Sequence, residues 1–328
     1  MAKSLRLISE GIAARREEFA RTIALESGKP LTLARGEAER AAASFAWAAG
    51  EAERFTGEII PVDTQAVGRG KTAWTLRVPR GIIYGITPFN FPLNLVAHKV
   101  APALAARNSI VIKPSPRTPL TALLLGEVFL ESGLPKSALQ IAPMDVKYIG
   151  EVFSDDRISM ISFTGSASVG WEIKRLASKK FTALELGGNA AVIVDKSANF
   201  ERSVSRSVTG AFAYSGQVCI SVQRIYVHEK LFDDWLADFA RRSHELIFGD
   251  PLDETTQISA MIDESAAIRA EEWIKEAIGN GAKLVSGGKR SGAIMEPSIL
   301  TNTTPEMRVV SEEVFAPVAV VERFSEFA

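Results

Sequence analysis

The sequence contains one thiol side chain that could serve as a nucleophile. Cys219 is the only cysteine and ends the run SGQVC at residues 215–219, after an expected helix and a glycine. A thiolate is a strong nucleophile once nearby N–H dipoles or cations favour its charged form. A buried, unreactive cysteine is the structural alternative for this position.

A carboxylate and an amide offer the groups that such a nucleophile needs. Glu185 ends a hydrophobic strand and precedes two glycines, and a carboxylate in partly apolar surroundings can serve as a general base. Asn90 stands between prolines and aromatics in TPFNFP at residues 87–92, which makes it a rigid amide donor suited to an oxyanion. The alternatives are a surface acid beside a turn and a turn residue that caps the next helix.

A further segment, MISFTGSASVG at residues 160–170, reads as a strand, a loop and a helix. Gly165 after a buried strand permits a tight turn, and the N-terminus of the next helix presents free N–H groups to a phosphate. The segment predicts a dinucleotide site. The spacing from Gly165 to Gly170 differs from the G-x-G-x-x-G fingerprint, so a plain structural turn is the alternative.

These segments require a scaffold, and the hydrophobic pattern predicts an α/β one. Short β-rich runs alternate with helical runs, which indicates a mostly parallel sheet with helices on both faces, followed by a second α/β round. An amphipathic helix is expected over the spacing of Leu5, Ile8, Ile12, Phe19 and Ile23, and another helix after Pro30. The expected strands are 81–86, 109–113, 139–142, 160–163, 182–186, 191–194 and 224–228, and the expected later helices are 93–106, 120–132, 168–177, 231–247 and 264–280.

Composition excludes several classes of function. The chain has 328 residues, 46% of them hydrophobic, which is enough for two domains, and its net charge of −1 gives no field that attracts nucleic acid or an anionic membrane. One cysteine and three scattered histidines exclude a disulfide framework and a Cys/His zinc site, so no metal is expected. Residues 1–15 have no signal-peptide pattern, and residues 81–98 are too interrupted for a membrane span, so we expect a cytoplasmic protein.

Taken together and in this order, the segments resemble the aldehyde dehydrogenase superfamily, in its NAD(P)-dependent, non-acylating form. The segments of Glu185 and Cys219, 34 residues apart, match its two signature motifs. The resemblance implies a Rossmann-like coenzyme-binding domain at residues 1–58 and 80–185, an oligomerisation hairpin at 59–79, and an α/β catalytic domain at 186–328. Family members run to roughly 450 to 500 residues, so segments at both ends are expected to be missing.

The resemblance also implies a mechanism that oxidises an aldehyde to a carboxylate. Cys219 becomes the nucleophile of a thiohemiacetal and then a thioester, while Asn90 and the Cys219 N–H form the oxyanion hole. Glu185 activates the deacylating water, and Lys99 aids proton relay. The family's acylating members generally lack this glutamate, so its presence favours a free carboxylate. The run CISVQR at residues 219–224 is similar to the subgroup acting on small polar aldehydes such as lactaldehyde, semialdehydes or phosphorylated aldehydes.

The implied cofactor is NAD or NADP. Lys113 would hold the adenosine ribose, Gly165 and Ser166 the pyrophosphate, and Glu313 and Phe315 the nicotinamide ribose and ring. NAD-preferring members often carry a glutamate three residues after the ribose lysine, but this chain has Pro116 there with Arg117 beside it, so we expect NADP to be accepted. The remaining expected cofactor contacts are Thr87, Pro88, Phe89, Ser115, Gly170, Leu186 and Gly187.

Two other interpretations remain open at this point. One is a non-catalytic fragment that has the motifs but cannot complete the active site. The other is a cofactor-independent cysteine hydrolase, which needs a histidine paired with Cys219, and none of the three histidines lies in a recognisable motif. The expected partners are a small aldehyde and, for the complete protein, further copies of itself in a dimer or tetramer.

Overall fold

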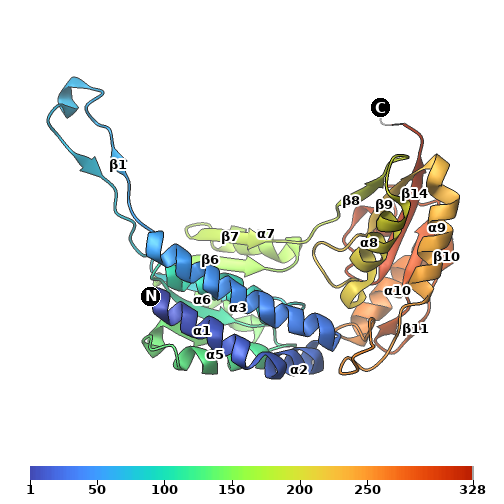
Figure 1. The fold of residues 1–328 in the computed structure, drawn as a ribbon, viewed down its shortest axis with the longest axis horizontal. Coiled ribbons are helices and arrows are strands. Elements are labelled where there is room, and N and C mark those ends of the chain that lie inside the picture. Colours follow the sequence, from blue (N-terminus) through green and yellow to red (C-terminus); the bar gives the residue numbers. More distant parts are fainter. Residues whose placement is uncertain (327–328) are drawn as a thin grey trace. The chain divides into compact units, whose positions relative to one another are not determined.

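The computed structural model describes residues 1–326, and the chain divides into two compact units (Figure 1). The first unit comprises Met1–Phe19 and Arg35–Glu185. The second unit comprises Ala20–Ala34 and the chain from Leu186 onward. Each unit contains one five-stranded sheet, so the predicted α/β class is confirmed.

The sheet of the first unit is entirely parallel, with strand order β5-β4-β3-β6-β7. Its strands are rich in β-branched residues, and the central strand is almost wholly buried, as expected of a parallel sheet covered on both faces. The strand order reverses at β3, and ligands of open α/β sheets bind outside the carboxyl ends at such a switch point. The strands are β3 (Ile82–Ile86), β4 (Ser109–Lys113), β5 (Leu139–Ile141), β6 (Ile158–Thr164) and β7 (Phe181–Glu185).

Helices pack on this sheet through small and apolar faces. Helix α1 (Ala2–Ala14) buries Leu5, Ile8 and Ile12 at helical spacing and packs against α4 (Asn94–Ala105) and α5 (Leu120–Leu130). A Cβ at Gly11 would lie 2.7 Å from the Val128 side chain, so the glycine lets α1 approach α5 closely. The remaining helices of four or more residues here are α6 (Ile149–Ser154), α7 (Ala167–Leu176) and most of α3 (Leu31–Arg54).

The prediction of one amphipathic helix across Phe19 and Ile23 was wrong. The structure has α1 and then α2 (Arg16–Ser27), separated at Arg15, whose φ of −100° and ψ of 22° leave the helical region. The Arg15 guanidinium binds the carboxylates of Glu18 and Glu127, at 2.8 Å each, which stabilises the break. The apolar spacing continued across the break because both helices bury one face.

The expected hairpin is confirmed as an antiparallel pair within the first unit. Strand β1 (Ile59–Ile60) pairs with β2 (Ala73–Trp74), with a short 3₁₀ turn at Ala66–Gly68 between them. Figure 1 shows it as a long two-stranded arm. Its apolar side chains are exposed, Ile59 to 81% and Trp74 to 62%.

The sheet of the second unit has the order β10-β13-β14-β9-β8, with only β10 antiparallel. Strand β14 (Val318–Phe324) shows how it is covered, since Val318 and Val320 pack into one apolar cluster and Ala319 and Val321 into another. The sequence pattern did not predict the strands after residue 280. The strands are β8 (Ala191–Val194), β9 (Arg224–His228), β10 (Lys283–Ser286), β13 (Ser298–Thr301) and the short pair β11 (Arg290–Ser291) and β12 (Ile294–Met295).

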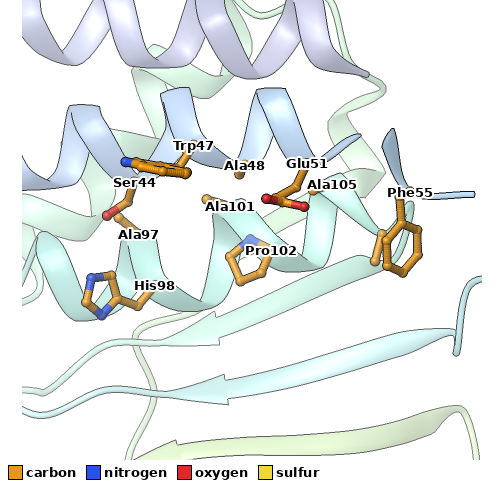
Figure 2. Close-up of a pocket in the computed structure, with 11 residues that line it drawn as sticks. Ser44, Trp47, Ala48, Glu51, Phe55, Ala97, His98, Ala101, Pro102 and Ala105 are labelled. Atoms are coloured by element: carbon orange, nitrogen blue, oxygen red, sulfur yellow. The ribbon is translucent and has the colours of Figure 1, made fainter. Parts of the chain in front are cut away.

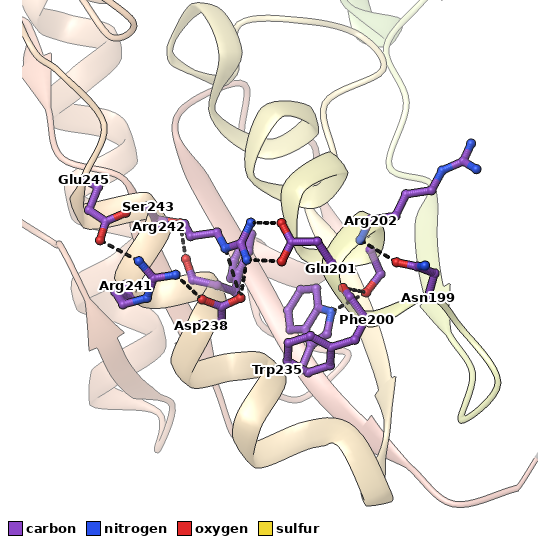
Figure 3. A network of polar contacts seen from close by, with 12 residues as sticks. Asn199, Phe200, Glu201, Arg202, Trp235, Asp238, Arg241, Arg242, Ser243 and Glu245 are labelled. Atoms are coloured by element: carbon purple, nitrogen blue, oxygen red, sulfur yellow. Dashed lines mark hydrogen bonds and ion pairs between the residues drawn. The ribbon is translucent and has the colours of Figure 1, made fainter.

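An ion-pair network joins two helices of the second unit, α8 (Phe200–Phe212) and α9 (Glu229–His244) (Figure 3). Arg242 of α9 donates to Glu201 of α8 at 2.6 Å and to Asp238 at 3.0 Å. The Trp235 indole N–H donates to the Ser203 hydroxyl at 2.9 Å beneath this network. The pairing fixes α8, whose C-terminal end leads into the Cys219 segment. The other helices of the unit are α10 (Glu264–Gly279) and α11 (Arg308–Ser311).

Among the residues that the structure describes, every helix is too short or too polar to cross a lipid bilayer.

Candidate active-site segments

In the first unit, the predicted site residues follow the carboxyl ends of adjacent parallel strands. The Thr87 N–H donates to the Lys113 carbonyl at 3.2 Å, which extends the pairing of β3 with β4 beyond the strands. The Gly165 N–H donates to the Glu185 carbonyl at 3.0 Å, which does the same for β6 and β7. Parallel strands end at one edge, so this edge collects the Asn90 loop, Lys113, Gly165 and Glu185.

The Asn90 loop is held by a residue that the sequence analysis missed. Asn90 is only 3% exposed, and the loop leads directly into α4. Glu37 of α3, 2% exposed, accepts hydrogen bonds from the backbone N–H groups of Leu93 at 2.9 Å and Asn94 at 3.1 Å. A carboxylate at a helix N-terminus satisfies orphan donors and complements the helix dipole. In the sequence, Glu37 is an acidic residue within an alanine-rich helix, and nothing there distinguishes it from a solvent-exposed glutamate.

Lys99 lies about one and a half turns into α4, and it is only 7% exposed. Its Nζ donates to the Thr164 hydroxyl at 2.8 Å and to the Ser162 hydroxyl at 3.2 Å. Burial lowers the pKa of Lys99 to about 8, and the Glu185 carboxylate opposes that shift. Burial also lowers the pKa of His98, with Arg40 and Lys99 adding to the effect and Glu185 opposing it. Lys99 and Glu185 therefore interact electrostatically, and an amine with this pKa exchanges protons readily near neutral pH.

A cavity of about 490 Å³ lies along α3 and α4 in the same unit (Figure 2). Five alanines, Trp47, Pro102 and Phe55 form its apolar lining, and its polar groups come from Ser44, Glu51 and His98. None of the predicted site residues lines this cavity. This cavity is therefore separate from the predicted site residues of the first unit.

The strand ends of the first unit offer groups that fit a dinucleotide. Position 165 requires glycine for steric reasons, because a Cβ there would lie 2.6 Å from the Phe163 ring. Ser166 is the N-cap of the ten-residue α7 with no side-chain cap bond, so the first N–H groups of that helix are available to an anion. Lys113 is 3% exposed, and burial lowers its pKa while Asp145 opposes the shift. Pro116 and Arg117 are exposed just beyond it.

In the second unit, the predicted residues precede three adjacent parallel strands. Strands β14, β9 and β8 are neighbours in that order, and their segments come from residues 312–317, 215–223 and 186–190 respectively. A Cβ at Gly216 would lie 2.1 Å from the Ala316 carbonyl oxygen, and one at Gly188 would lie 3.1 Å from the Cys219 carbonyl oxygen. The three segments therefore meet at the amino edge of this sheet.

Cys219 is exposed and follows a strained turn. Tyr214 and Ser215 have φ values of 52° and 53°, and Gly216 has φ of 69°. Non-glycine residues rarely adopt this left-handed conformation, and two in succession must be held by their surroundings. Such outliers concentrate at functional sites.

Glu313 contacts the diglycine segment directly. Its carboxylate accepts the Gly188 N–H at 3.2 Å, and a Cβ at Gly187 would overlap it at 1.8 Å. Burial raises the pKa of Glu313, while the Gly188 N–H and Arg269 lower it. Phe315, two residues on, has φ of 53°. Glu313 is thus fixed within the second unit against the glycines that follow Glu185 in the sequence.

Gln223 is a second residue that the sequence analysis missed as a support. It is 4% exposed, and its side-chain amide donates to the carbonyls of Val309 at 2.9 Å and Glu312 at 2.7 Å. Its carbonyl oxygen accepts the Val314 N–H at 2.8 Å. The side chain of Asn189 adds a bond to the Val310 carbonyl at 2.7 Å. These bonds clamp the Glu313 segment to the start of β9.

The structure thus collects the predicted residues in two groups, one in each unit. Within the described residues 1–326, no group of three or more His, Cys, Asp or Glu residues is arranged to hold a metal ion. The first group comprises Thr87, Pro88, Phe89, Asn90, Lys99, Lys113, Ser115, Gly165, Ser166, Gly170 and Glu185, and the second comprises Leu186, Gly187, Cys219, Glu313 and Phe315.

A parallel sheet of Rossmann-type strand order and a second α/β unit that presents an exposed cysteine define the class of this protein as a two-unit α/β protein. The aldehyde dehydrogenase family model matches residues 2–328, and the chain belongs to that family. The family expected from the sequence is therefore confirmed.

Individual relatives give the same result. The chain is 44% identical over 316 residues to a 3-sulfolactaldehyde dehydrogenase of Priestia aryabhattai, covering 96% of this chain and 66% of that protein. The chain thus spans about two thirds of this relative's length. Aldehyde dehydrogenase 21 from Physcomitrella patens in complex with the reaction product succinate has a TM-score of 0.94 and 40% identity, over 99% of this chain and 69% of that one. Glyceraldehyde-3-phosphate dehydrogenase GapN from Methanocaldococcus jannaschii complexed with NADP has a TM-score of 0.94 and 37% identity, over 99% and 71%.

Proposed function

We propose that the protein oxidises a small polar aldehyde to a carboxylate with NAD(P)⁺, using Cys219 as the nucleophile. The observation that carries the proposal is the amino edge of the second unit, where an exposed thiol follows a strained turn against the diglycine and Glu313 segments. The family membership supplies independent support.

The chain's own residues account for each step. The Cys219 sulfur bonds to the aldehyde carbon, and the resulting thiohemiacetal oxyanion accepts hydrogen bonds from the Asn90 amide and the Cys219 N–H. Each preformed donor contributes on the order of 3 kcal/mol in the transition state. The C–H bond of the thiohemiacetal then breaks, and the hydrogen leaves with both bonding electrons for the electron acceptor, so that a thioester remains on Cys219. Glu185 deprotonates a water that attacks this thioester, which releases the carboxylate and restores the thiol.

The cofactor is assigned to the strand ends of the first unit. Lys113, Ser115, the Gly165–Ser166 turn and the N-terminus of α7 would bind its ribose and pyrophosphate. Gly170 and the loop residues Thr87, Pro88 and Phe89 would add further contacts, and Glu313 and Phe315 would bind the nicotinamide ribose and ring. NAD(P)⁺ bound there supplies the electron acceptor of the oxidation. Lys99, with an amine poised to exchange protons, aids proton transfer. Pro116 and the exposed Arg117 favour acceptance of the 2′-phosphate of NADP. The ratio of kcat/KM for NAD and NADP tests this cofactor assignment. A strong preference for NAD would contradict it.

The substrate class follows from the relatives and the sequence. The names of the similar proteins specify 3-sulfolactaldehyde and glyceraldehyde-3-phosphate, and one is in complex with succinate, so all three involve short anionic compounds. We infer a short polar aldehyde for this chain.

The exposed apolar side chains of the hairpin, including Ile59 and Trp74, support self-association into a dimer or tetramer through this arm.

The test incubates the protein with a panel of short aldehydes and either cofactor, and follows cofactor reduction by absorbance at 340 nm. We expect turnover in the parent and at least about 10⁴-fold less in Cys219→Ala, because the covalent route is lost. Ser205→Ala, which removes an exposed hydroxyl on α8, is the control and should keep the parent rate. Turnover that survives in Cys219→Ala would contradict the proposal, and a folded parent without turnover would favour the non-catalytic alternative.

A further inference from the structure

A buried lysine of the second unit lies against the strained turn that precedes Cys219. Lys29, in the link between α2 and α3, is 1% exposed, and its ammonium is 4.5 Å from the centroid of the Tyr214 ring. The Tyr214 hydroxyl donates to the Ser27 carbonyl at 3.2 Å. Both contacts join residues 27–29 to the first residue of the left-handed turn.

The turn needs such contacts because its backbone is unfavourable. Tyr214 and Ser215 adopt φ/ψ of 52°/40° and 53°/34°, where the Cβ of an L-residue crowds the backbone. Relaxation of either residue would alter the direction of the chain through Gly216. Since Gly216 lies against the Ala316 carbonyl, that change would move Cys219 relative to its neighbours in the second unit.

The link around Lys29 is itself fixed firmly enough to serve as a support. Gly28 has φ of 71°, and a Cβ there would lie 2.8 Å from the Ala260 carbonyl oxygen. The Leu31 N–H donates to the Pro251 carbonyl at 2.8 Å. The turn itself is also held, because the Ser215 hydroxyl donates to the Ser259 carbonyl at 2.7 Å and the Gln217 side chain accepts the Ile262 N–H at 2.9 Å. Residues 27–29 and 259–262 therefore both contact the turn and its C-terminal flank, and they also contact each other.

We infer that Lys29 is a positioning residue for the nucleophile: its ammonium holds the Tyr214 ring, the ring holds the left-handed turn, and the turn directs Cys219. An ammonium over an aromatic face is attracted by the ring quadrupole, and the attraction is larger when both groups are removed from water. This inference rests on the proposed role of Cys219 as the nucleophile.

The test measures the second-order rate constant for alkylation of Cys219 by iodoacetamide at pH 7, by intact-protein mass spectrometry. Lys29→Met keeps the length of the side chain without its charge, and we expect alkylation about 30-fold slower, the size of a desolvated cation–π contact. In turnover assays kcat should fall by a similar factor while the KM for the cofactor stays within about twofold. Lys230→Met, at an exposed position on α9, is the matched control and should alkylate at the parent rate.

Tyr214→Leu and the double variant separate positioning from general stability. If Lys29 acts through the ring, Tyr214→Leu loses as much as Lys29→Met, and the double variant loses no more than either one. Additive losses, or a Lys29→Met variant that alkylates at the parent rate, would overturn the inference. Should Lys29→Met fail to fold, Tyr214→Leu with Lys29 intact makes the same comparison, and an unchanged rate there overturns it equally. A parent that reacts only as fast as glutathione would contradict the proposed nucleophile itself.

Discussion

The two units present their chemical groups at opposite edges of their sheets and hold them by different means. In the first unit, loops after parallel strands carry Asn90, Lys113 and Glu185, so sheet topology alone brings them to the carboxyl edge. In the second unit, loops before the strands carry Cys219 and Glu313, and these loops are fixed by left-handed residues, close glycine contacts and the buried Gln223. Position follows from topology in one unit and from local backbone geometry and hydrogen bonds in the other.

The first way to test this comparison is to remove the amide of the first unit. Asn90→Ala deletes a proposed oxyanion donor, and we expect kcat to fall by about 10²- to 10³-fold because one preformed donor is lost. The cofactor KM should change little, because the strand ends that would bind it are untouched. Steady-state kinetics with both substrates varied measures this. A loss confined to KM would contradict the oxyanion role.

The second test concerns the buried Lys99 and pH. Because the folded pKa is about 8 and the ordinary value is 10.5, folding disfavours the charged form, so Lys99 costs stability below pH 8 and the cost disappears as pH rises towards 10.5. Between pH 8 and 10.5, the unfolding free energy of the parent should therefore rise relative to that of Lys99→Met by up to about 3 kcal/mol. Denaturant unfolding at pH 7.5, 9 and 10 measures the difference. A difference that stays constant would show that Lys99 titrates normally.

The third test addresses the close contacts of the second unit. Gly216→Ala places a Cβ 2.1 Å from the Ala316 carbonyl oxygen at a φ of 69°, whereas Gly292→Ala meets nothing within 4 Å at a φ of 59°. Both variants bear the left-handed strain, so their difference isolates the steric contact. We expect the loss of unfolding free energy to be about 2 kcal/mol larger in Gly216→Ala than in Gly292→Ala. Equal losses in denaturant unfolding would mean that the Cys219 and Ala316 segments are not held together this way.

The sequence predicted the first unit better than the second, for physical reasons. Alternating strand and helix patterns predict a parallel sheet, and the expected strands 81–86, 109–113, 160–163 and 182–186 correspond to β3, β4, β6 and β7 of that sheet. The short strands at 283–286 and 298–301 and the longer one at 318–324 carry no comparable alternation with helices, and they were missed. The break at Arg15 was missed because the apolar spacing continues across it.

The supporting residues of the site were beyond sequence reasoning altogether. Glu37, Lys29 and Gln223 are polar residues of types that are usually exposed, and their roles depend on partners 56, 185 and 91 positions away in the chain. The left-handed conformation of Tyr214 and Ser215 has no marker in the sequence, because only Gly216 is of the type that favours it. The chemical residues were recognisable by type and spacing, whereas the groups that hold them are set by tertiary packing.

The most direct test of the account is to trap the covalent intermediate in Glu185→Gln. In the proposed mechanism, acylation of Cys219 does not require the Glu185 base but hydrolysis of the thioester does, so the variant should give a pre-steady-state burst of reduced cofactor followed by slow turnover. Mass spectrometry of the quenched reaction should then find the acyl group of the aldehyde on the peptide that contains Cys219. A burst without an adduct on Cys219, or no burst at all in a variant that is folded and binds the cofactor, would contradict the proposed chemistry.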